Sequence, residues 1–428
     1  MTLDTARAVA TPNGGHAVGT SLNPAPTPSA RYRQVRSLTD ELAARLSAED
    51  QTAQSIPEAS PTKWHRAHTS WFFEQFVLSS RADYKVFDPT FGYFFNSYYE
   101  AVGPRHPRPQ RGLVTRPGIA EIGLYRAHVD RAMTELLTAG DDRPGRDALI
   151  DLGCHHEQQH QELLLMDAKH LLALHPFSPE YVPRSTENDA DAPPLTWRGK
   201  DGGLQQIGHD GDGFAFDNEG PRHVVYLQPF EIANRAVTNA EWFEFIADGG
   251  YRRPELWLSD GWARMQADCW QSPAYWLIED GVWTTFTLSG RRAVRGGEPV
   301  CHISFYEADA YARWAGARLP SEQEWEVAAR DVEDLRGQLL DPRRCHPDIA
   351  GAAMIGDVWE WTSSAYLPYP GFRPVAGAVG EYNGKFMCDQ HVLRGASAVT
   401  PAAHERMTYR NFFPAAARRA FSGMRLAR

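Results

Sequence analysis

The sequence predicts an α+β protein built from two parts, a helical bundle followed by a mixed α+β domain. In the first 175 residues, apolar side chains recur at the spacing of amphipathic helices. After residue 200 the sequence changes to short β-like runs, helical segments and long loops rich in glycine and tryptophan. Residues 176–200 are rich in proline and acidic residues and are expected to link the two parts. The chain has 428 residues, 42% of them hydrophobic, which is enough for two domains that each bury a core.

Four amphipathic helices are expected within residues 31–175, and they predict a four-helix bundle. The third is the clearest, because Ile122, Tyr125 and Val129 lie on one apolar stripe. Residues 1–30 lack periodicity and have few large apolar side chains, so they are expected to form a disordered tail. The helices are expected at about 32–46, 64–80, 118–138 and 147–174.

A long excursion, residues 83–117, separates the second helix from the third and is expected to be non-helical. It is rich in aromatic residues, proline and arginine. Connections of this length are usually functional or disordered, and the aromatic content argues against disorder. We therefore expect this loop to take part in function.

The second domain is expected to span residues 201–428. The run HVVYLQPFEI predicts strands. Two helical segments are expected, in TNAEWFEFIADGG and SFYEADAYARWAGARLPSEQEWEVAAR. Together these segments predict a mixed α+β domain with much irregular structure.

Charge and cysteine content restrict the functional class. A formal net charge of −10 argues against a nucleic acid or an anionic membrane as partner. The five cysteines are widely spaced and form no C-x-x-C pair, which argues against a disulfide framework. The N-terminus lacks the apolar core of a secretion signal, and no run of eighteen apolar residues occurs. A cytoplasmic protein that acts on small molecules is therefore expected.

The segment GCHHEQQHQE contains H-E-x-x-H, the signature of zinc metalloproteases. His156 and His160 lie four residues apart on an expected helix, so both imidazoles can reach one metal ion. The continuation H-x-x-G-x-x-H is absent, and His68 on an apolar, aromatic helix face is the better third ligand. Glu157 would point away from the ligand face, and His65, three residues before His68, is expected to face solvent or the helix start. Three imidazoles without a carboxylate suit Fe(II) with open positions but also permit zinc, so the spacing leaves the metal undecided.

Further polar and aromatic residues could complete a site around this metal. Gln159 shares the ligand face of the helix. Arg105 and Arg108, set among prolines, could grip a carboxylate. Tyr98 and Tyr99 either place a phenol near the metal or pack in the core.

The motifs resemble a known family over nearly the whole chain after residue 30. KWHRAHTSWFFEQF followed by HHEQQHQE resembles the DinB-like four-helix domain of the ergothioneine-pathway sulfoxide synthases. The second domain is similar to the formylglycine-generating-enzyme (sulfatase-modifying-factor) domain, a C-type-lectin-like fold. It carries the motifs AVTNAEWFEFI, ARLPSEQEWEVAAR, GDVWEWTSSAY, VLRGAS and YRNFFPAAARRAFSGMRL. The two in this order resemble nonheme iron enzymes that couple a thiol to the imidazole of hercynine using O2.

The resemblance implies roles for individual residues. It implies Fe(II) held by His68, His156 and His160, with O2 as co-substrate. Gln159 and Asn411 would help to hold hercynine, and aromatic faces would receive its trimethylammonium group. The thiol substrate, cysteine or γ-glutamylcysteine, would be held through its carboxylate by Arg105 and Arg108. The aromatic walls would come from Trp359, Trp361, Phe412 and Phe413.

The catalytic tyrosine distinguishes two branches of the family. The actinobacterial branch places it in the C-terminal domain and has an aspartate two residues after the asparagine, where this chain has Phe413. The chain therefore resembles the second branch, in which tyrosines of the N-terminal excursion take over. Tyr98 and Tyr99 are the candidates that this resemblance implies, with Tyr382 next.

Other activities remain open at this stage. Formylglycine-generating enzymes need a cysteine pair after the R-G-x-S motif, and RGASAVTPAAHERMTYRNFF has none, so thiol oxidation of that kind is not expected. An ovothiol-type enzyme acting on histidine and cysteine, or a selenoneine-type enzyme using a selenosugar, would use the same scaffold. A zinc hydrolase and a noncatalytic, metal-stabilised binding protein are the alternatives from other classes.

Overall fold

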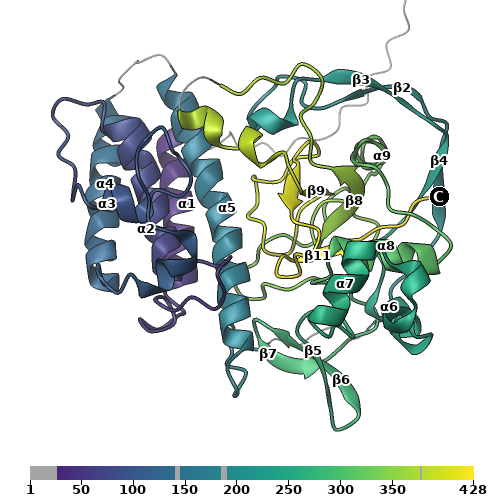
Figure 1. The fold of residues 1–428 in the computed structure, drawn as a ribbon. Coiled ribbons are helices and arrows are strands. Elements are labelled where there is room, and N and C mark those ends of the chain that lie inside the picture. The colour runs from purple at the N-terminus through teal and green to yellow at the C-terminus, as the bar shows by residue number, and fades with distance from the viewer. Residues whose placement is uncertain (1–26, 140–144, 185–189, 376–377) are drawn as a thin grey trace, which may run out of the picture.

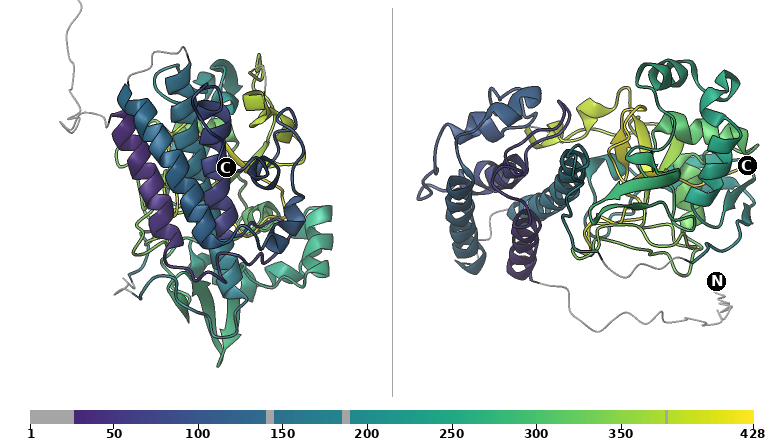
Figure 2. Two further views of the ribbon diagram at one scale, coloured as in Figure 1. Left: turned by 90° about the vertical axis from the view of Figure 1, so that its left-hand side faces the viewer. Right: turned by 90° about the horizontal axis from the view of Figure 1, so that it is seen from below.

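The N-terminal part forms a bundle whose long helices lie side by side (Figures 1 and 2). The computed structural model describes residues 27–139, 145–184, 190–375 and 378–428. In this bundle α5 packs against both α1 and α2, and α2 also packs against α4. Thr27 caps α1 and that helix begins at Pro28, so the last residues of the expected tail are helical, while residues 1–26 lie outside the described part. The helices are α1 (Pro28–Ala43), α2 (Thr62–Phe73), α3 (Phe91–Phe95), α4 (Ile119–Ala139) and α5 (Arg146–Ala173).

The excursion, residues 83–117, was expected to be non-helical, but it contains the short helix α3 and a 3-10 turn, so that expectation was wrong in part. A π-helical turn, Glu74–Leu78, extends α2, and a 3-10 turn spans Arg108–Leu113. Between them, α3 buries Phe91 and Phe95 against Tyr125 of α4, at ring distances of 5.0 and 6.4 Å. The aromatic residues that argue against disorder therefore anchor this segment to the bundle.

Helix α5 is central because it has three different buried faces. His156 and His160 face α2. Glu157 and Gln161 bond to α1, Gln161 through its Nε2 to the carbonyl oxygen of Val35 at 2.8 Å. A side chain at Gly153 could not fit, since its Cβ would lie 2.5 Å from the ring of Phe73 on α2. Glycine thus lets the two helices approach one turn before the first histidine.

The third face of α5 meets the second domain. His155, Gln159 and Glu162 are spaced by four and three residues, and all three bond across the interface. Figure 1 shows α5 as the bundle helix next to this domain. No helix in the described part of the chain is both long and apolar enough to cross a membrane.

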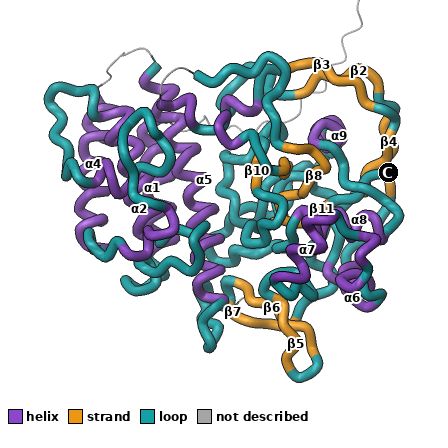
Figure 3. Tube along the Cα trace, in the orientation of Figure 1, coloured by secondary structure: helices purple, strands orange, loops and turns teal. Residues whose placement is uncertain are grey.

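The second domain contains a four-stranded sheet in the order β10-β9-β8-β11, in which β11 runs parallel to β8 and the other neighbours are antiparallel. Smaller sheets pair β1 with β4, β2 with β3, and β6 with both β5 and β7. Long loops connect these elements (Figure 3). The predicted α+β class is confirmed. The strands are β1 (Trp197–Lys200), β2 (Gly203–Ile207), β3 (His223–Leu227), β4 (Phe230–Ala233), β5 (Trp276–Glu279), β6 (Val282–Thr287), β7 (Gly290–Ala293), β8 (Trp359–Ala365), β9 (His391–Arg394), β10 (Asn411–Phe413) and β11 (Ser422–Met424).

The helices of this domain differ in two respects from the expected ones. The expected long helix is split in two, because the chain turns through Gly316, which has a φ of 65°, before Pro320. An additional helix, α7, was not expected from the sequence, and β1 occupies the end of the expected linker. The helices are α6 (Asn239–Ala247), α7 (Ser259–Ala267), α8 (Phe305–Trp314) and α9 (Glu322–Ala329).

Candidate metal centre

Three histidines converge between α2 and α5. His68 lies on α2, and His156 and His160 lie one turn apart on α5. Nε2 of His68 is 3.1 Å from Nε2 of His156, and one ring nitrogen from each histidine lies within 4.8 Å of the others. A metal–imidazole nitrogen bond is about 2.1 Å long, so nitrogens this close can share one ion. Among the His, Cys, Asp and Glu side chains of the described residues, these three histidines form the group whose ligand atoms lie close enough together to hold a metal ion.

The second nitrogen of each ring indicates which nitrogen is free for a metal. Nδ1 of His68 donates to the carbonyl oxygen of Phe95 at 2.6 Å, which leaves the lone pair on Nε2. Nδ1 of His160 lies 2.9 Å from Nδ1 of His65. Nδ1 of His156 has no hydrogen-bond partner among the described residues. Without metal, Nε2 of His156 can donate to Nε2 of His68 at 3.1 Å, and a cation that takes the place of this proton would be bound by both nitrogens, so this donor set fits a metal ion.

Burial holds the three rings in the neutral form that binds metals. It lowers the pKa of His156 to about 3. It also lowers the pKa of His68 and of His160 well below the usual value, and the neighbouring imidazoles lower both further. Three neutral imidazoles leave up to three positions of an octahedral ion for other ligands.

Aromatic rings cover the bundle side of this centre. The ring of His68 stacks on Trp64 at 4.6 Å and on Trp71 at 5.5 Å. Phe72 lies 4.6 Å from the ring of His156. These apolar neighbours exclude water, which strengthens electrostatic interactions inside the site.

A polar contact from the second domain covers the other side. The hydroxyl of Tyr382 donates to Oε1 of Gln159, whose Nε2 donates to the hydroxyl of Tyr409 at 2.5 Å. The ring of Tyr382 lies 5.7 Å from that of His156. The amide of Gln159 is therefore held beside the three histidines by two phenols of the other domain.

The two tyrosines of the excursion lie one aromatic ring away from the histidines. Tyr98 and Tyr99 stack on each other at 4.6 Å. Tyr98 is 6.3 Å from Tyr382, and Tyr99 is 5.6 Å from Trp71. Burial raises the pKa of both phenols, so both keep their proton near neutral pH. Tyr382 is the nearest of the three tyrosines to a ligand ring.

The arginines of the excursion differ in their surroundings. Arg105 is exposed and pairs with Glu100 at 2.7 Å. Arg108 donates to the carbonyl oxygen of Glu58 at 2.5 Å. Arg111 is buried, with its guanidinium carbon 3.4 Å from the ring centre of Trp64. Burial and the charges of Arg108 and Arg105 lower the pKa of Arg111. Positive charge is thus concentrated around Arg111, and a bound anion would stabilise it.

The residues of the second domain that were expected to contact a substrate lie in different surroundings. Asn411 and Phe412 lie on β10, where Phe412 stacks on Tyr366 at 4.1 Å. Phe413 is partly buried against the core. Trp361 is in the domain core and donates to the carbonyl oxygen of Ile303, whereas Trp359 donates to Glu162 of α5 across the interface.

Glu157 belongs to a buried ion network on the neighbouring face of α5, the face that meets α1. Its oxygens accept from Arg36 at 2.8 Å, Thr39 at 2.7 Å and Arg126 at 3.2 Å. Burial alone would raise its pKa, but the charges of Arg36 and Arg126 lower the pKa of Glu157 to about 2. This carboxylate is thus held away from the metal position, as the sequence predicted, and cannot serve there as a general base.

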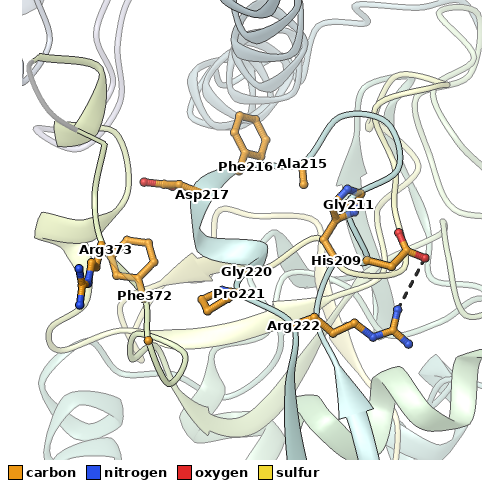
Figure 4. A pocket seen from close by; sticks show the side chains of 12 residues that line it. His209, Gly211, Ala215, Phe216, Asp217, Gly220, Pro221, Arg222, Phe372 and Arg373 are labelled. Carbon is orange, nitrogen blue, oxygen red and sulfur yellow. Dashed lines mark ion pairs between the residues drawn. The ribbon is translucent and has the colours of Figure 1, made fainter.

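An open cleft of about 590 Å³ lies in the second domain, lined by residues that include Phe216 and Arg222 (Figure 4). Phe216 lines this cleft and also stacks on Tyr382 at 5.3 Å. Asp217 lines it as well and accepts from Asn383 at 2.6 Å. Two stacked rings therefore connect the cleft to the ring of His156.

Two residues that the sequence did not single out belong to this region. His65 is expected to face solvent or the helix start, but the structure buries it against His160, so that expectation was wrong. Its position three residues before His68, on nearly the same helix face, was the available signal. Arg111 continues the three-residue spacing of Arg105 and Arg108, and side chains three apart align in a 3-10 helix.

Comparison with known proteins matches both parts of the chain. Residues 31–164 match the DinB superfamily, and residues 200–339 and 346–428 match the sulfatase-modifying factor enzyme 1-like domain. A hercynine oxygenase of Mycolicibacterium smegmatis is 36% identical over 329 residues, which cover 69% of this chain and 75% of that protein. A hercynine oxygenase of Mycolicibacterium thermoresistibile is 32% identical over 412 residues, which cover 87% and 88% of the two chains.

A formylglycine-generating enzyme is similar over about half of this chain. The enzyme of Streptomyces coelicolor is 37% identical over 266 residues, which cover 51% of this chain and 81% of that protein. The similarity with the two hercynine oxygenases covers 69% and 87% of this chain and therefore extends beyond the second domain.

Proposed function

The chain belongs to the hercynine oxygenase family, and on this premise we propose that it joins the sulfur of a thiol to the imidazole of hercynine with O2 as oxidant. The thiol would be cysteine or γ-glutamylcysteine, and the product a sulfoxide in ergothioneine biosynthesis. Electrons and atoms balance in this reaction. Formation of the carbon–sulfur bond and oxidation of the sulfur each release two electrons, and O2 accepts all four. One of its oxygen atoms enters the sulfoxide and the other becomes water. The cluster of three neutral histidines at the domain interface is the observation that carries this proposal.

We assign Fe(II) to His68, His156 and His160. A bound Fe(II) ion would supply O2 activation and would lower the pKa of a coordinated thiol. The set contains no carboxylate, and the glutamate of H-E-x-x-H is engaged with Arg36 and Arg126, which argues against a zinc hydrolase.

The surrounding side chains would orient the two substrates. Gln159, fixed by Tyr382 and Tyr409, would hold hercynine beside the histidines. Asn411, Phe412 and Phe413 remain proposed contacts of the same substrate, with aromatic faces for its trimethylammonium group. Arginines of the excursion would bind the carboxylate of the thiol.

The test is an anaerobic assay. Protein loaded with Fe(II) receives hercynine and either cysteine or γ-glutamylcysteine, and O2 is then admitted. We expect a sulfoxide conjugate by mass spectrometry with one O2 consumed per product. A parallel reaction with histidine in place of hercynine tests the ovothiol-type alternative, and zinc-loaded protein with a peptide substrate tests the hydrolase. No conjugate and no O2 uptake above background with any thiol would refute the proposal.

Replacing the tyrosines identifies the proton donor. Loss of a general acid typically costs about 10²–10⁴-fold in rate. We expect Tyr98→Phe or Tyr99→Phe to reduce sulfoxide formation within this range and to divert O2 into oxidation of the thiol alone, measured by product analysis. Tyr93→Phe is the control, because the ring of Tyr93 is exposed and belongs to the same excursion. This variant should leave the product unchanged. Full activity in both variants together with loss in Tyr382→Phe would move the role to the second domain.

Replacing the arginines separately tests the carboxylate site. Hydrogen bonds to charged groups contribute about 1.5–3 kcal/mol, so removing one should raise KM for the thiol by about tenfold or more. We expect this for Arg108→Ala and Arg111→Ala, which share one face of the 3-10 turn, and a smaller effect for exposed Arg105→Ala. Measured KM values for hercynine serve as the internal control. A larger effect at Arg105 than at Arg111 would instead support the pair Arg105 and Arg108.

A further inference from the structure

A chain of buried polar side chains leads from one proposed metal ligand to the second domain. Nδ1 of His65, on α2, lies 2.9 Å from Nδ1 of His160. Nε2 of His65 lies 3.1 Å from Oδ2 of Asp167, two turns further along α5. Oδ1 of Asp167 forms an ion pair at 3.0 Å with Nε of Arg419 from the second domain. His65 and Asp167 are 2% and 5% exposed, so solvent does not take the place of these contacts.

Hydrogen-bonding rules determine where the protons lie in this chain. A carboxylate only accepts, so Nε2 of His65 must donate to Asp167. One proton then remains for the two facing Nδ1 atoms. If this proton were on Nδ1 of His65, Nδ1 of His160 would accept it in a hydrogen bond. The hydrogen of the His160 ring would then be on Nε2, pointing towards His68 and His156. If it is on His160, Nε2 of His160 is free to bind a metal.

The three ligands are therefore supported unequally. Nδ1 of His68 donates to a backbone carbonyl. Nδ1 of His156 has no partner among the described residues. Only for His160, within that set, does the second nitrogen lead to a carboxylate, through one imidazole. A carboxylate behind a ligand imidazole fixes the tautomer and makes the ring a stronger donor.

We propose that His65 and Asp167 are positioning residues that orient His160 for coordination through Nε2 and strengthen its bond to the metal. This inference rests on the metal site of the proposed function. Because Arg419 pairs with Asp167 and also donates to the carbonyl oxygen of Glu58 at 3.1 Å, docking of the second domain completes the chain. The metal site of the bundle is thus coupled to the domain that supplies the contact to Gln159.

Metal affinity, measured without turnover, tests this role. The dissociation constant for Co(II) is obtained by competition with a chelator, and the absorption bands of bound Co(II) report its coordination. We expect His65→Phe, which removes the acceptor for Nδ1 of His160, to weaken Co(II) binding about 10–100-fold and to alter these bands. His65→Gln offers an amide oxygen as acceptor and should recover part of the affinity. Asp167→Asn keeps an acceptor but loses the charge, and should give an intermediate loss.

Unfolding measurements separate a positioning role from a merely structural one. Urea midpoints of the metal-free variants show how far each substitution destabilises the fold. Co(II) affinity equal to that of the wild type in His65→Gln, Asp167→Asn and His65→Phe would overturn the proposal, whatever their midpoints. If His65→Phe does not fold, the other two variants decide by the same criterion. Failure of the wild-type protein to bind Co(II), or unchanged binding in His156→Ala, would instead refute the metal site itself.

Discussion

Replacing His156 with alanine should abolish both metal binding and sulfoxide formation while leaving the fold intact. The imidazole supplies one of the three ligand nitrogens, and two nitrogens cannot hold the ion in the same way. Without metal, Nε2 of His156 shares one hydrogen bond at 3.1 Å with Nε2 of His68, and its Nδ1 has no partner among the described residues, so the metal-free protein loses a single hydrogen bond. Metal analysis after anaerobic loading should fall from about one Fe per chain to a small fraction.

His155→Ala is the matched control, because His155 is the next residue on α5 and is also buried. Its ring stacks on Phe214 at 3.8 Å and its Nδ1 lies 2.9 Å from Nδ1 of His404, so it belongs to the face that meets the second domain. This variant should keep its metal. Fe(II) should also raise the unfolding temperature of the wild type and of His155→Ala, but not of His156→Ala. Equal metal content in the two variants would contradict the ligand assignment.

The parts of this site that depend on local spacing could be predicted from the sequence. His156 and His160 lie four residues apart on a helix, and that geometry holds wherever the helix packs. The positions of the long bundle helices follow from apolar periodicity for the same reason. The position of His68 beside the other two histidines depends on tertiary packing. It could still be predicted as a ligand, because burying an unpaired imidazole on an aromatic helix face costs free energy.

The parts that depend on long-range packing could not be predicted. His65 faces His160 because α2 approaches α5 closely at Gly153, and a single helix pattern does not reveal that approach. The three buried faces of α5 weaken its apolar periodicity, since each face meets a different polar network. The burial of Arg111 depends on the 3-10 turn, which belongs to an excursion with no regular pattern, and on its contact with Trp64 of α2.

Glu157→Gln should destabilise the bundle strongly, which is the second large effect that we expect. Removing one partner of a buried ion network typically costs about 3–5 kcal/mol in the free energy of unfolding. The lower end is expected, because Arg36 keeps Asp130 at 2.7 Å and Arg126 keeps Asp40 at 3.0 Å. Urea unfolding at neutral pH measures this loss. A protease-type general base would show the opposite pattern, with activity lost and stability kept.

Glu162→Gln is the matched control, because Glu162 is also buried on α5 but its partners among the described residues are neutral groups, Trp359, Ser397 and Thr400. Burial raises the pKa of Glu162, so neutralising it should cost far less than neutralising Glu157.

The pH dependence of stability tests the role of the Glu157 charge in a second way. The pKa of Glu157 falls from 4.5 to about 2 on folding, so its contribution is present above pH 4.5 and is lost as the pH falls towards 2. The stability difference between wild type and Glu157→Gln should therefore shrink across that interval. A difference that stays constant there would show that packing, and not charge, fixes this glutamate.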